Sequence, residues 1–386
     1  MNTVRVNRKA AGRVASGHPW IFSSDVVSKD SVTPGEAVAV ADDRGKILGV
    51  AHFSSTSQIT LRMLSGTRQE LDRAFYLRRL QQALAHRERV VENSNAYRIV
   101  SSEGDLLPGL IVDRYGDYLV MQTLTQGMDR AKEVVVDCLT ELIQPAGILA
   151  RNEAGVRKLE GLPQETVVVA GAIPDGISVE MNGLKFTADL LRGQKTGTYL
   201  DQRENYVAAA RYVRGGRVLD CFSSTGGFAL HVARHAESVD AVESSPLAIE
   251  AAKANAALNG IENIEFRQAD VFDYLSGRDS AKYSMIILDP PAFAKSRKQV
   301  DDAMRGYRDI NLRALRMLNP GGILVTCSCS HHVSEAALMQ TVAEAGLDSG
   351  RTLRVLERRT QASDHPILLT VPETLYLKCV ILEVLS

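Results

Sequence analysis

Residues 218–230 read Val-Leu-Asp-Cys-Phe-Ser-Ser-Thr-Gly-Gly-Phe-Ala-Leu, an apolar run that ends in an acidic residue and a glycine-rich turn. Val218–Asp220 predicts a buried strand, and Phe228–His235 predicts the helix that follows it. Gly226 and Gly227 permit a tight turn and a close approach of the backbone to a ligand. Because ligands of open α/β sheets bind beyond the carboxyl ends of the strands, this stretch predicts a ligand-binding α/β domain.

The same alternation continues downstream, where apolar runs are separated by helical segments such as Pro246–Leu258. The further predicted strands are Val239–Glu243, Ile264–Gln268, Met285–Leu288 and Ile323–Cys327. Strands that alternate with helices predict a mostly parallel sheet with helices on its faces. The runs Leu368–Thr370 and Leu375–Val384 predict antiparallel strands at one edge of that sheet.

The sequence upstream of this domain has two different patterns. Short strand-like runs separated by turn signals predict a small β-barrel, and a predicted helix, Glu70–Val91, follows it. From Tyr97 a strand, strand, helix, strand order predicts an α+β module, in which the helix is Asp129–Ile143. Asn182-Gly183 predicts a hairpin that leads into the last domain. We therefore expect a multidomain α/β protein with domains at 1–72, 73–190 and 191–386.

Charge is unevenly distributed over the 386 residues, although the net charge is only −1. Residues 1–90 hold 14 Lys and Arg against 8 Asp and Glu (14 − 8 = +6), and the remainder holds 31 against 38 (31 − 38 = −7). A basic N-terminal module on an acidic body favours a polyanionic partner. Five scattered cysteines indicate free thiols in a reducing compartment, and neither a signal peptide nor a membrane span is evident. The sequence thus predicts a cytoplasmic protein without membrane association.

Acidic residues end three consecutive predicted strands and indicate a nucleoside site. They are Asp220, Glu243 and Asp270, and Glu243 is placed to accept the two hydroxyls of a ribose. Asp270 and the adjacent Val271 are placed to hold an adenine. The sequence lacks a G-x-G-x-x-G fingerprint after the first strand, and it lacks a Walker A lysine. A nucleoside without a pyrophosphate fits better, and S-adenosylmethionine is the natural candidate.

The fourth and fifth predicted strands end in loops that suggest chemistry on a planar base. The fourth is followed by Asp289-Pro290-Pro291-Ala292-Phe293, in which two prolines stiffen the loop. The fifth runs into Cys327-Ser328-Cys329-Ser330-His331-His332. A thiolate is required when carbon 5 of a pyrimidine is to be methylated, because carbon 5 becomes nucleophilic only after addition at carbon 6. Core packing, a metal site formed by Cys327, Cys329, His331 and His332, and a redox pair are the competing interpretations, and we favour a nucleophile and no metal.

The motifs GQKTGTYLDQREN, LDCFSSTGGFAL, VESSPLAIEAAKANAALNG, LDPPAFAKS and CSCS together resemble the RlmI-type 23S ribosomal RNA 5-methylcytosine methyltransferases. The similarity extends over nearly the whole chain, since GHPWIFSSDV and the barrel resemble the PUA domain of that family. The resemblance implies an N-terminal PUA-like barrel, a central α+β domain and a C-terminal Rossmann-like class I methyltransferase domain with a mostly parallel seven-stranded sheet.

The resemblance also implies roles for individual residues. Cys329 would be the nucleophile and Asp289 would hold the cytosine, whereas Cys327 would only pack at the strand end. Lys295, with Pro290 and Phe293, would contact the substrate. Asp201 would cap a helix, and with Arg203 it would support the cofactor loop. The implied cofactor-binding residues are Gln194, Lys195, Thr196, Tyr199, Asp220, Phe222, Ser223, Thr225, Gly226, Glu243, Asp270 and Val271.

The implied activity is S-adenosylmethionine-dependent formation of 5-methylcytosine in 23S rRNA through a cysteine-cytosine adduct. An rRNA guanine base-nitrogen methyltransferase is the alternative among enzymes, and a non-catalytic RNA-binding ribosome assembly factor is the alternative of another class. The sequence leaves open the target nucleotide, the base that removes the carbon-5 proton, and naked RNA or a partly assembled large subunit as substrate. The oligomeric state is also open, with a homodimer as one option.

Overall fold

The computed structural model describes residues 1–29, 31–191, 198–276, 282–294 and 297–385, and it divides into two compact units. Unit 1 comprises Met1–Val179, Ala188–Gly197 and Ser363–Thr374, and unit 2 comprises Glu180–Thr187, Thr198–Ala362 and Leu375–Ser386. The predicted barrel and the predicted central module thus belong to one unit. Whether residues 1–72 and 73–190 behave as separate domains stays a prediction.

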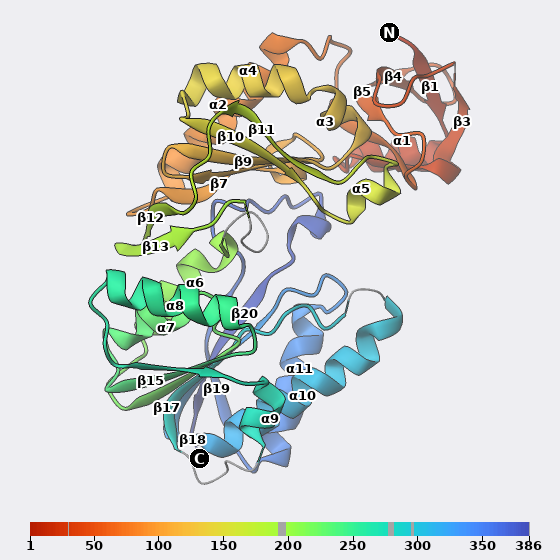
Figure 1. Ribbon diagram of the computed structural model, residues 1–386. Coiled ribbons are helices and arrows are strands. Elements are labelled where there is room, and N and C mark those ends of the chain that lie inside the picture. The colour runs from red at the N-terminus through yellow and green to blue at the C-terminus, as the bar shows by residue number, and fades with distance from the viewer. Residues whose placement is uncertain (30, 192–197, 277–281, 295–296, 386) are drawn as a thin grey trace. The chain divides into compact units, whose positions relative to one another are not determined.

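Unit 1 begins with a six-stranded, barrel-like sheet in the order β2-β6-β5-β4-β1-β3 (Figure 1). Its elements are β1 (Thr3–Val6), α1 (Arg8–Ala15), β2 (Trp20–Phe22), β3 (Val26–Lys29), β4 (Ala37–Ala41), β5 (Ile47–Phe53) and β6 (Ile59–Ser65). β1 pairs parallel with β4 and antiparallel with β3. Alternate strand residues such as Val4, Val38 and Phe53 point inward and form one apolar core.

The second part of unit 1 is a five-stranded sheet in the order β11-β10-β9-β8-β7. Its elements are α2 (Arg73–Val90), β7 (Ala96–Ser101), β8 (Leu110–Tyr115), β9 (Tyr118–Thr123), α3 (Gln126–Arg130), α4 (Lys132–Ile143), β10 (Gly147–Asn152), α5 (Val156–Leu159) and β11 (Glu165–Gly171). Asp72 begins α2 by accepting a hydrogen bond from the backbone N–H of Phe75, which is a standard N-cap. The apolar faces of α2 and α4 pack on this sheet.

Buried polar contacts join the barrel to the second sheet within unit 1. Arg62 on β6 forms a 2.9 Å ion pair with Glu160, and both side chains are almost completely buried. His52 on β5 lies 3.1 Å from the hydroxyl of Tyr76 on α2. Gly127 lies against the ring of His52 so closely that an added Cβ would come within 2.2 Å of it. These contacts explain why the barrel and the central module form a single compact unit.

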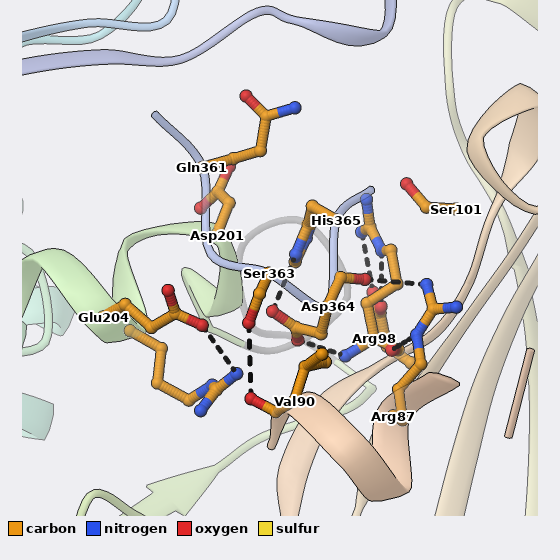
Figure 2. Close-up of polar contacts among 12 residues, drawn as sticks. Arg87, Val90, Arg98, Ser101, Asp201, Glu204, Gln361, Ser363, Asp364 and His365 are labelled. Carbon is orange, nitrogen blue, oxygen red and sulfur yellow. Dashed lines mark hydrogen bonds and ion pairs between the residues drawn. The ribbon is translucent and has the colours of Figure 1, made fainter. Parts of the chain in front are cut away.

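The segment Ser363–Thr374 comes late in the sequence but belongs to unit 1. Arg87 donates to the backbone carbonyl of Asp364 over 2.7 Å, and the Asp364 carboxylate accepts the backbone N–H of Arg98 over 2.8 Å (Figure 2). The hydroxyl of Ser363 donates to the carbonyl of Val90 over 3.3 Å. The segment is therefore held by buried hydrogen bonds rather than by strand pairing.

The predicted strand Leu368–Thr370 is wrong for this reason. Leu368 makes one isolated bridge, to Val371, and Leu369 is 98% exposed. An apolar run that is exposed on a loop has the same composition as a short strand, so composition alone misassigned it.

Unit 2 is built on a seven-stranded sheet in the order β16-β15-β14-β17-β18-β20-β19. Its elements are α6 (Arg203–Ala210), β14 (Arg217–Cys221), α7 (Gly227–Ala233), β15 (Ser238–Glu243), α8 (Pro246–Leu258), β16 (Ile264–Gln268), α9 (Val271–Leu275), β17 (Tyr283–Leu288), α10 (Val300–Met317), β18 (Leu318–Ser328), α11 (Glu335–Asp348), β19 (Leu353–Arg359) and β20 (Lys378–Val384). The first five strands in this order are parallel, and β20 is antiparallel to both β18 and β19. The mostly parallel seven-stranded sheet is confirmed.

Helices cover both faces of this sheet (Figure 1). α6 and α7 pack on one apolar layer, and α9, α10 and α11 pack on the other. Gly227 is required where α6 meets α7, since an added Cβ would come within 2.4 Å of the Tyr206 ring. The predicted C-terminal strand is confirmed as β20, but it lies inside the sheet, and the unpredicted, arginine-rich β19 is the edge strand.

The Asn182-Gly183 hairpin is confirmed and joins β12 (Ile177–Met181) to β13 (Leu184–Ala188). Both turn residues have positive φ, 53° and 76°, as this turn requires. Among the described residues, no helix is long and apolar enough to cross a membrane.

Candidate active site

The turn after β14 has a strained backbone. Phe222 and Ser224 have φ angles of 63° and 49°, a left-handed region that residues with a Cβ rarely adopt, and Gly226 has a φ of 89°. The backbone N–H of Ser223 donates to Val242 on β15, which ties the turn to the neighbouring strand. Strain of this kind concentrates at functional sites.

Two polar atoms in and before this turn are buried without a partner. Asp220 is 1% exposed, and one carboxylate oxygen accepts the backbone N–H of Ala229 over 2.9 Å. The other oxygen, Oδ1, and Oγ of Ser223 have no hydrogen-bond partner among the described residues. Burial, together with the negative charge of Asp289, raises the pKa of Asp220 well above its usual range. Since buried polar atoms are normally satisfied, both atoms point to a ligand.

Glu243 ends β15 and bends back toward the same turn. Its carboxylate accepts the backbone N–H groups of Ser224, over 3.0 Å, and Ser245, over 2.9 Å. These bonds hold the carboxylate at the carboxyl edge of the sheet, the position predicted for a ribose ligand.

Asp270, the third acidic residue predicted at a strand end, also has a structural role. Asp270 is the N-cap of α9 and accepts the backbone N–H groups of Phe272 and Asp273 over 2.8 Å and 3.2 Å. It is nevertheless exposed, and Val271 beside it is buried in the core. Capping orients the Asp270 carboxylate, and the exposure leaves it accessible at the sheet edge.

Asp289 follows β17 and is held by a directional chain of side chains. Arg359 donates to Oδ1 of Asn205 over 2.8 Å, Asn205 donates to Oε1 of Gln202 over 2.7 Å, and Gln202 donates to Oδ1 of Asp289 over 2.9 Å. Because an arginine can only donate, it determines which way both amides point. The Arg359–Asn205–Gln202 chain therefore presents an N–H donor to Asp289.

Sequence reasoning missed this chain. Gln202 and Asn205 are buried and lie within the LDQREN motif, which predicts a cofactor loop but assigns no role to either residue. Asp201 does not cap α6, as expected from sequence. Its carboxylate instead accepts the hydroxyl of Tyr376 over 3.0 Å, because the short helical turn Leu200–Gln202 precedes α6 and directs the side chain elsewhere.

Cys329 follows β18 directly, on the strand next to β17. Its neighbours Ser328 and Ser330 both contact the hydroxyl of Tyr307 on α10, at 2.9 Å and 3.2 Å. The Ser330 hydroxyl also accepts the backbone N–H of Ala294 from the loop after β17, over 3.3 Å. The two predicted reactive loops are thus hydrogen-bonded to one another.

The five cysteines differ in exposure, and all are free. Cys329 is half-buried, whereas Cys138, Cys221, Cys327 and Cys379 are buried. Cys327 lies inside β18 opposite Cys379 and packs in the core, as expected for a packing residue. No cluster of three or more metal-ligating side chains occurs in the described part of the chain.

Aromatic side chains support the Asp289 loop. Phe293 is half-buried, and its ring lies 4.8 Å from that of Tyr307 and 6.0 Å from that of Phe272. Pro290 is buried. Phe293 therefore has a packing role beside any contact with a base.

Tyr199 lies near both reactive loops. Its carbonyl accepts the hydroxyl of Tyr206 over 3.2 Å, and burial raises the pKa of Tyr199 to about 12, with negative charge at Asp289 and Asp201 acting in the same direction. Phe222, Thr225 and Gly226 all lie in the turn after β14. Of the predicted site residues, Gln194, Lys195, Thr196 and Lys295 lie outside the described residues.

Known proteins resemble this chain over its whole length. Residues 4–66 match the PUA-like domain family, and residues 163–371, more than half of the chain, match the S-adenosylmethionine-dependent methyltransferase family. Ribosomal RNA large subunit methyltransferase I of Tolumonas auensis is 42% identical over 97% of this chain and 98% of that protein. The chain belongs to the ribosomal RNA large subunit methyltransferase I family. The family member of Shewanella amazonensis is 41% identical over 95% of each chain.

The methyltransferase fold is also seen in solved structures. A methyltransferase crystallised with SAH has a TM-score of 0.86 and 20% identity, over 99% of this chain and 100% of that chain. At this identity the likeness concerns the fold. The protein is thus an S-adenosylmethionine-dependent methyltransferase with an N-terminal PUA-like domain.

Proposed function

We propose that this methyltransferase forms 5-methylcytosine in 23S rRNA, with Cys329 as the nucleophile. The observation that carries the proposal is the pairing of two loops: the half-buried Cys329 follows β18, and Asp289 follows the adjacent β17. The names of the relatives support ribosomal RNA of the large subunit as the substrate.

The proposed cofactor residues surround the turn after β14. S-adenosylmethionine supplies the electrophilic methyl group. The unpartnered Oδ1 of Asp220 and Oγ of Ser223 would accept and donate hydrogen bonds to its methionine part, beside Phe222, Thr225 and Gly226. Glu243 would accept the ribose hydroxyls, and Asp270 and Val271 would flank the adenine. Tyr199, with Gln194, Lys195 and Thr196, would complete the site.

The proposed reaction conserves atoms and charge. The Cys329 thiolate adds to carbon 6 of the cytosine, and the electron pair of the former 5,6 double bond becomes available at carbon 5. A proton held between the Asp289 carboxyl group and ring nitrogen 3 would neutralise the negative charge that develops on the ring. Carbon 5 would then take the methyl group as the bond between that group and the sulfonium sulfur breaks, and S-adenosylhomocysteine would be left as the second product. Loss of the carbon-5 proton to a base expels the thiolate and restores the double bond.

RNA binding is the proposed task of the PUA-like barrel. Its exposed basic side chains are Arg5, Arg8, Lys9, Lys29, Arg44 and Lys46. Such residues bind a phosphate backbone with an affinity that falls steeply with salt. Pro290, Phe293 and Lys295 are proposed to contact the target nucleotide near the reactive loops.

Two assays test the proposal. The Cys329→Ala variant should bind S-adenosylmethionine normally but lose methyl transfer to 23S rRNA from cells that lack the protein. RNA that carries 5-fluorocytosine should form a stable adduct with the wild type, because carbon 5 then has no proton to release. Full activity of Cys329→Ala, with no adduct on the wild type, would contradict the cysteine mechanism. Mass mapping of the product would then distinguish a guanine base-nitrogen methyltransferase.

A further inference from the structure

Lys378 is a buried lysine beside the Cys329 loop. It is the first residue of β20, is 4% exposed and lies opposite Ser328 in the β18–β20 register. Its ammonium group donates to the backbone carbonyl of Ser330 over 2.7 Å and to that of Tyr376 over 2.9 Å. These bonds hold a positive charge next to the residue that follows Cys329.

The charge of Lys378 is incompletely compensated. No carboxylate of the described chain lies within ion-pair distance, 4.0 Å, of its ammonium group. A buried cation without an anion is costly, and burial lowers the pKa of Lys378 to about 8, while negative charge at Cys329 and Glu335 acts to raise it. A thiolate at Cys329 would supply an anion at this place.

We propose that Lys378 is a positioning residue that stabilises the thiolate form of Cys329. The proposal deepens the cysteine mechanism and depends on it for its catalytic meaning. The physical reason is that only the thiolate adds to carbon 6, and an ordinary cysteine, with a pKa of about 8.5, is only a few per cent ionised at pH 7. A lysine ammonium held on the carbonyl of Ser330, the residue after Cys329, favours the ionised form. The two backbone carbonyls prevent the flexible lysine side chain from turning away.

Other titratable groups surround these two side chains. Burial raises the pKa of both Tyr199 and Tyr307, and negative charge at Asp289 and Cys329 acts in the same direction. Glu335 begins α11 near Lys378, and the positive charge of Lys378, after burial, lowers the pKa of His331. The negative charge of Asp289 opposes ionisation of a nearby thiol. A fixed cation would offset this effect and lower the pKa of the thiol.

The thiol pKa can be measured without any assay of methyl transfer. Cys329 is the half-buried cysteine among four buried ones, so iodoacetamide should alkylate it selectively in the folded, full-length protein. The alkylation rate at Cys329, followed by peptide mass spectrometry over a range of pH, gives its apparent pKa. We expect a value below the ordinary one of about 8.5 in the wild type. A wild-type value at or above 8.5 would overturn the proposal without the use of any variant.

Three variants test how much the charge of Lys378 contributes to the pKa of Cys329. Lys378→Met should slow alkylation at pH 7 about tenfold, which corresponds to a rise of one pKa unit. Lys378→Arg should largely restore the wild-type profile, since it retains the charge. Lys253→Met removes an exposed lysine of α8 and should leave the profile unchanged. Identical profiles for the wild type and a folded Lys378→Met protein would refute the role of Lys378.

The measured effect of Lys378 on the thiol pKa does not depend on whether Cys329 is the nucleophile of the reaction. If Cys329→Ala retains full methyl transfer, the cysteine mechanism fails even when the thiol pKa is low. If Cys329→Ala is inactive but Lys378→Met leaves the thiol pKa unchanged, the mechanism stands and the inference about Lys378 fails. If Lys378→Met weakens RNA binding and leaves the thiol pKa unchanged, the lysine contacts a phosphate instead.

Discussion

In the part of the chain that the structure describes, two buried charges of unit 2 lack the ion-pair partners that buried arginines of unit 1 have. In unit 1, buried arginines have carboxylate partners: Arg87 pairs with Asp105 over 2.8 Å, and Arg157 pairs with Asp129 over 2.8 Å. In unit 2, Asp220 and Lys378 are as deeply buried, yet neither has an opposite charge within ion-pair distance among the described residues. Paired buried charges hold a fold together, whereas a buried charge without a partner marks a place where a ligand or a reactive group is expected.

The largest effect should follow from breaking a paired charge in unit 1. Arg87→Ala removes the arginine donors to the Asp105 carboxylate, which keeps the backbone N–H of Ser101. It also removes the arginine donor to the Asp364 carbonyl (Figure 2). We expect the free energy of unfolding to fall by about 3–5 kcal/mol, because the remaining carboxylate is left uncompensated. Urea unfolding measures this change. A loss below about 1 kcal/mol would show that this ion pair contributes little to the stability of unit 1.

Disruption of the chain behind Asp289 should affect activity more than folding. Gln202→Leu removes the glutamine donor to Asp289 and one of the two acceptors of the Asn205 amide, which keeps the Thr360 carbonyl. Since small displacements of a reactive group can reduce rates by up to about 100-fold, we expect kcat to fall about 10- to 100-fold. Affinity for S-adenosylmethionine should change little. The matched control is Gln340→Leu, an exposed glutamine of α11, which should retain full activity.

Replacement of the buried Asp220 carboxyl group should stabilise the ligand-free protein at high pH but weaken cofactor binding. Burial raises the pKa of Asp220, so the ligand-free wild type should lose stability as pH rises through that pKa, and Asp220→Asn should not. We expect the variant to bind S-adenosylmethionine about tenfold more weakly, since one charged hydrogen bond contributes about 1.5–3 kcal/mol. Calorimetry and thermal unfolding at several pH values check both effects. Unchanged affinity would mean that Asp220 does not contact the cofactor.

The smallest effect is expected for an exposed pair. Arg354 and Glu383 form a 3.0 Å ion pair across β19 and β20, and the arginine side chain is 60% exposed. Surface pairs contribute about 0–1 kcal/mol, so Arg354→Ala should change the free energy of unfolding by less than about 1 kcal/mol. Urea unfolding of both variants, Arg354→Ala and Arg87→Ala, compares their losses in the free energy of unfolding directly. A loss as large as that of Arg87→Ala would show that pairing, and not burial, sets the difference between the units.

Local patterns were sufficient for much of the fold. Strand–helix alternation predicted the parallel strands of unit 2, and Asn182-Gly183 predicted the hairpin, because both depend on neighbouring residues. The edge strand β19 was missed because its charged sequence does not show the apolar alternation of a half-buried strand. Leu368–Thr370 was misassigned because exposure cannot be read from an apolar triplet.

In the candidate site, too, local patterns predicted some residues and missed those that depend on distant contacts. Strand-end residues such as Asp220, Glu243 and Asp289 were predicted at the carboxyl edge, and the structure places them there, since the topology of a parallel sheet brings these ends together. Gln202 and Asn205 were not recognised, since their tasks depend on Arg359, more than 150 residues away. Lys378 cannot be picked out from the sequence, because nothing there distinguishes it from any other lysine that begins a strand.

The sequence by itself thus determined the type of fold, the family and the position of Cys329 and Asp289 at strand ends. It could do so because glycine turns, strand-end acids and apolar periodicity act over a few residues. Only the tertiary structure determined which buried charges have an oppositely charged partner within ion-pair distance and which do not. That distinction depends on side chains brought together from distant segments, as Arg87 meets Asp364 and Lys378 meets the Cys329 loop.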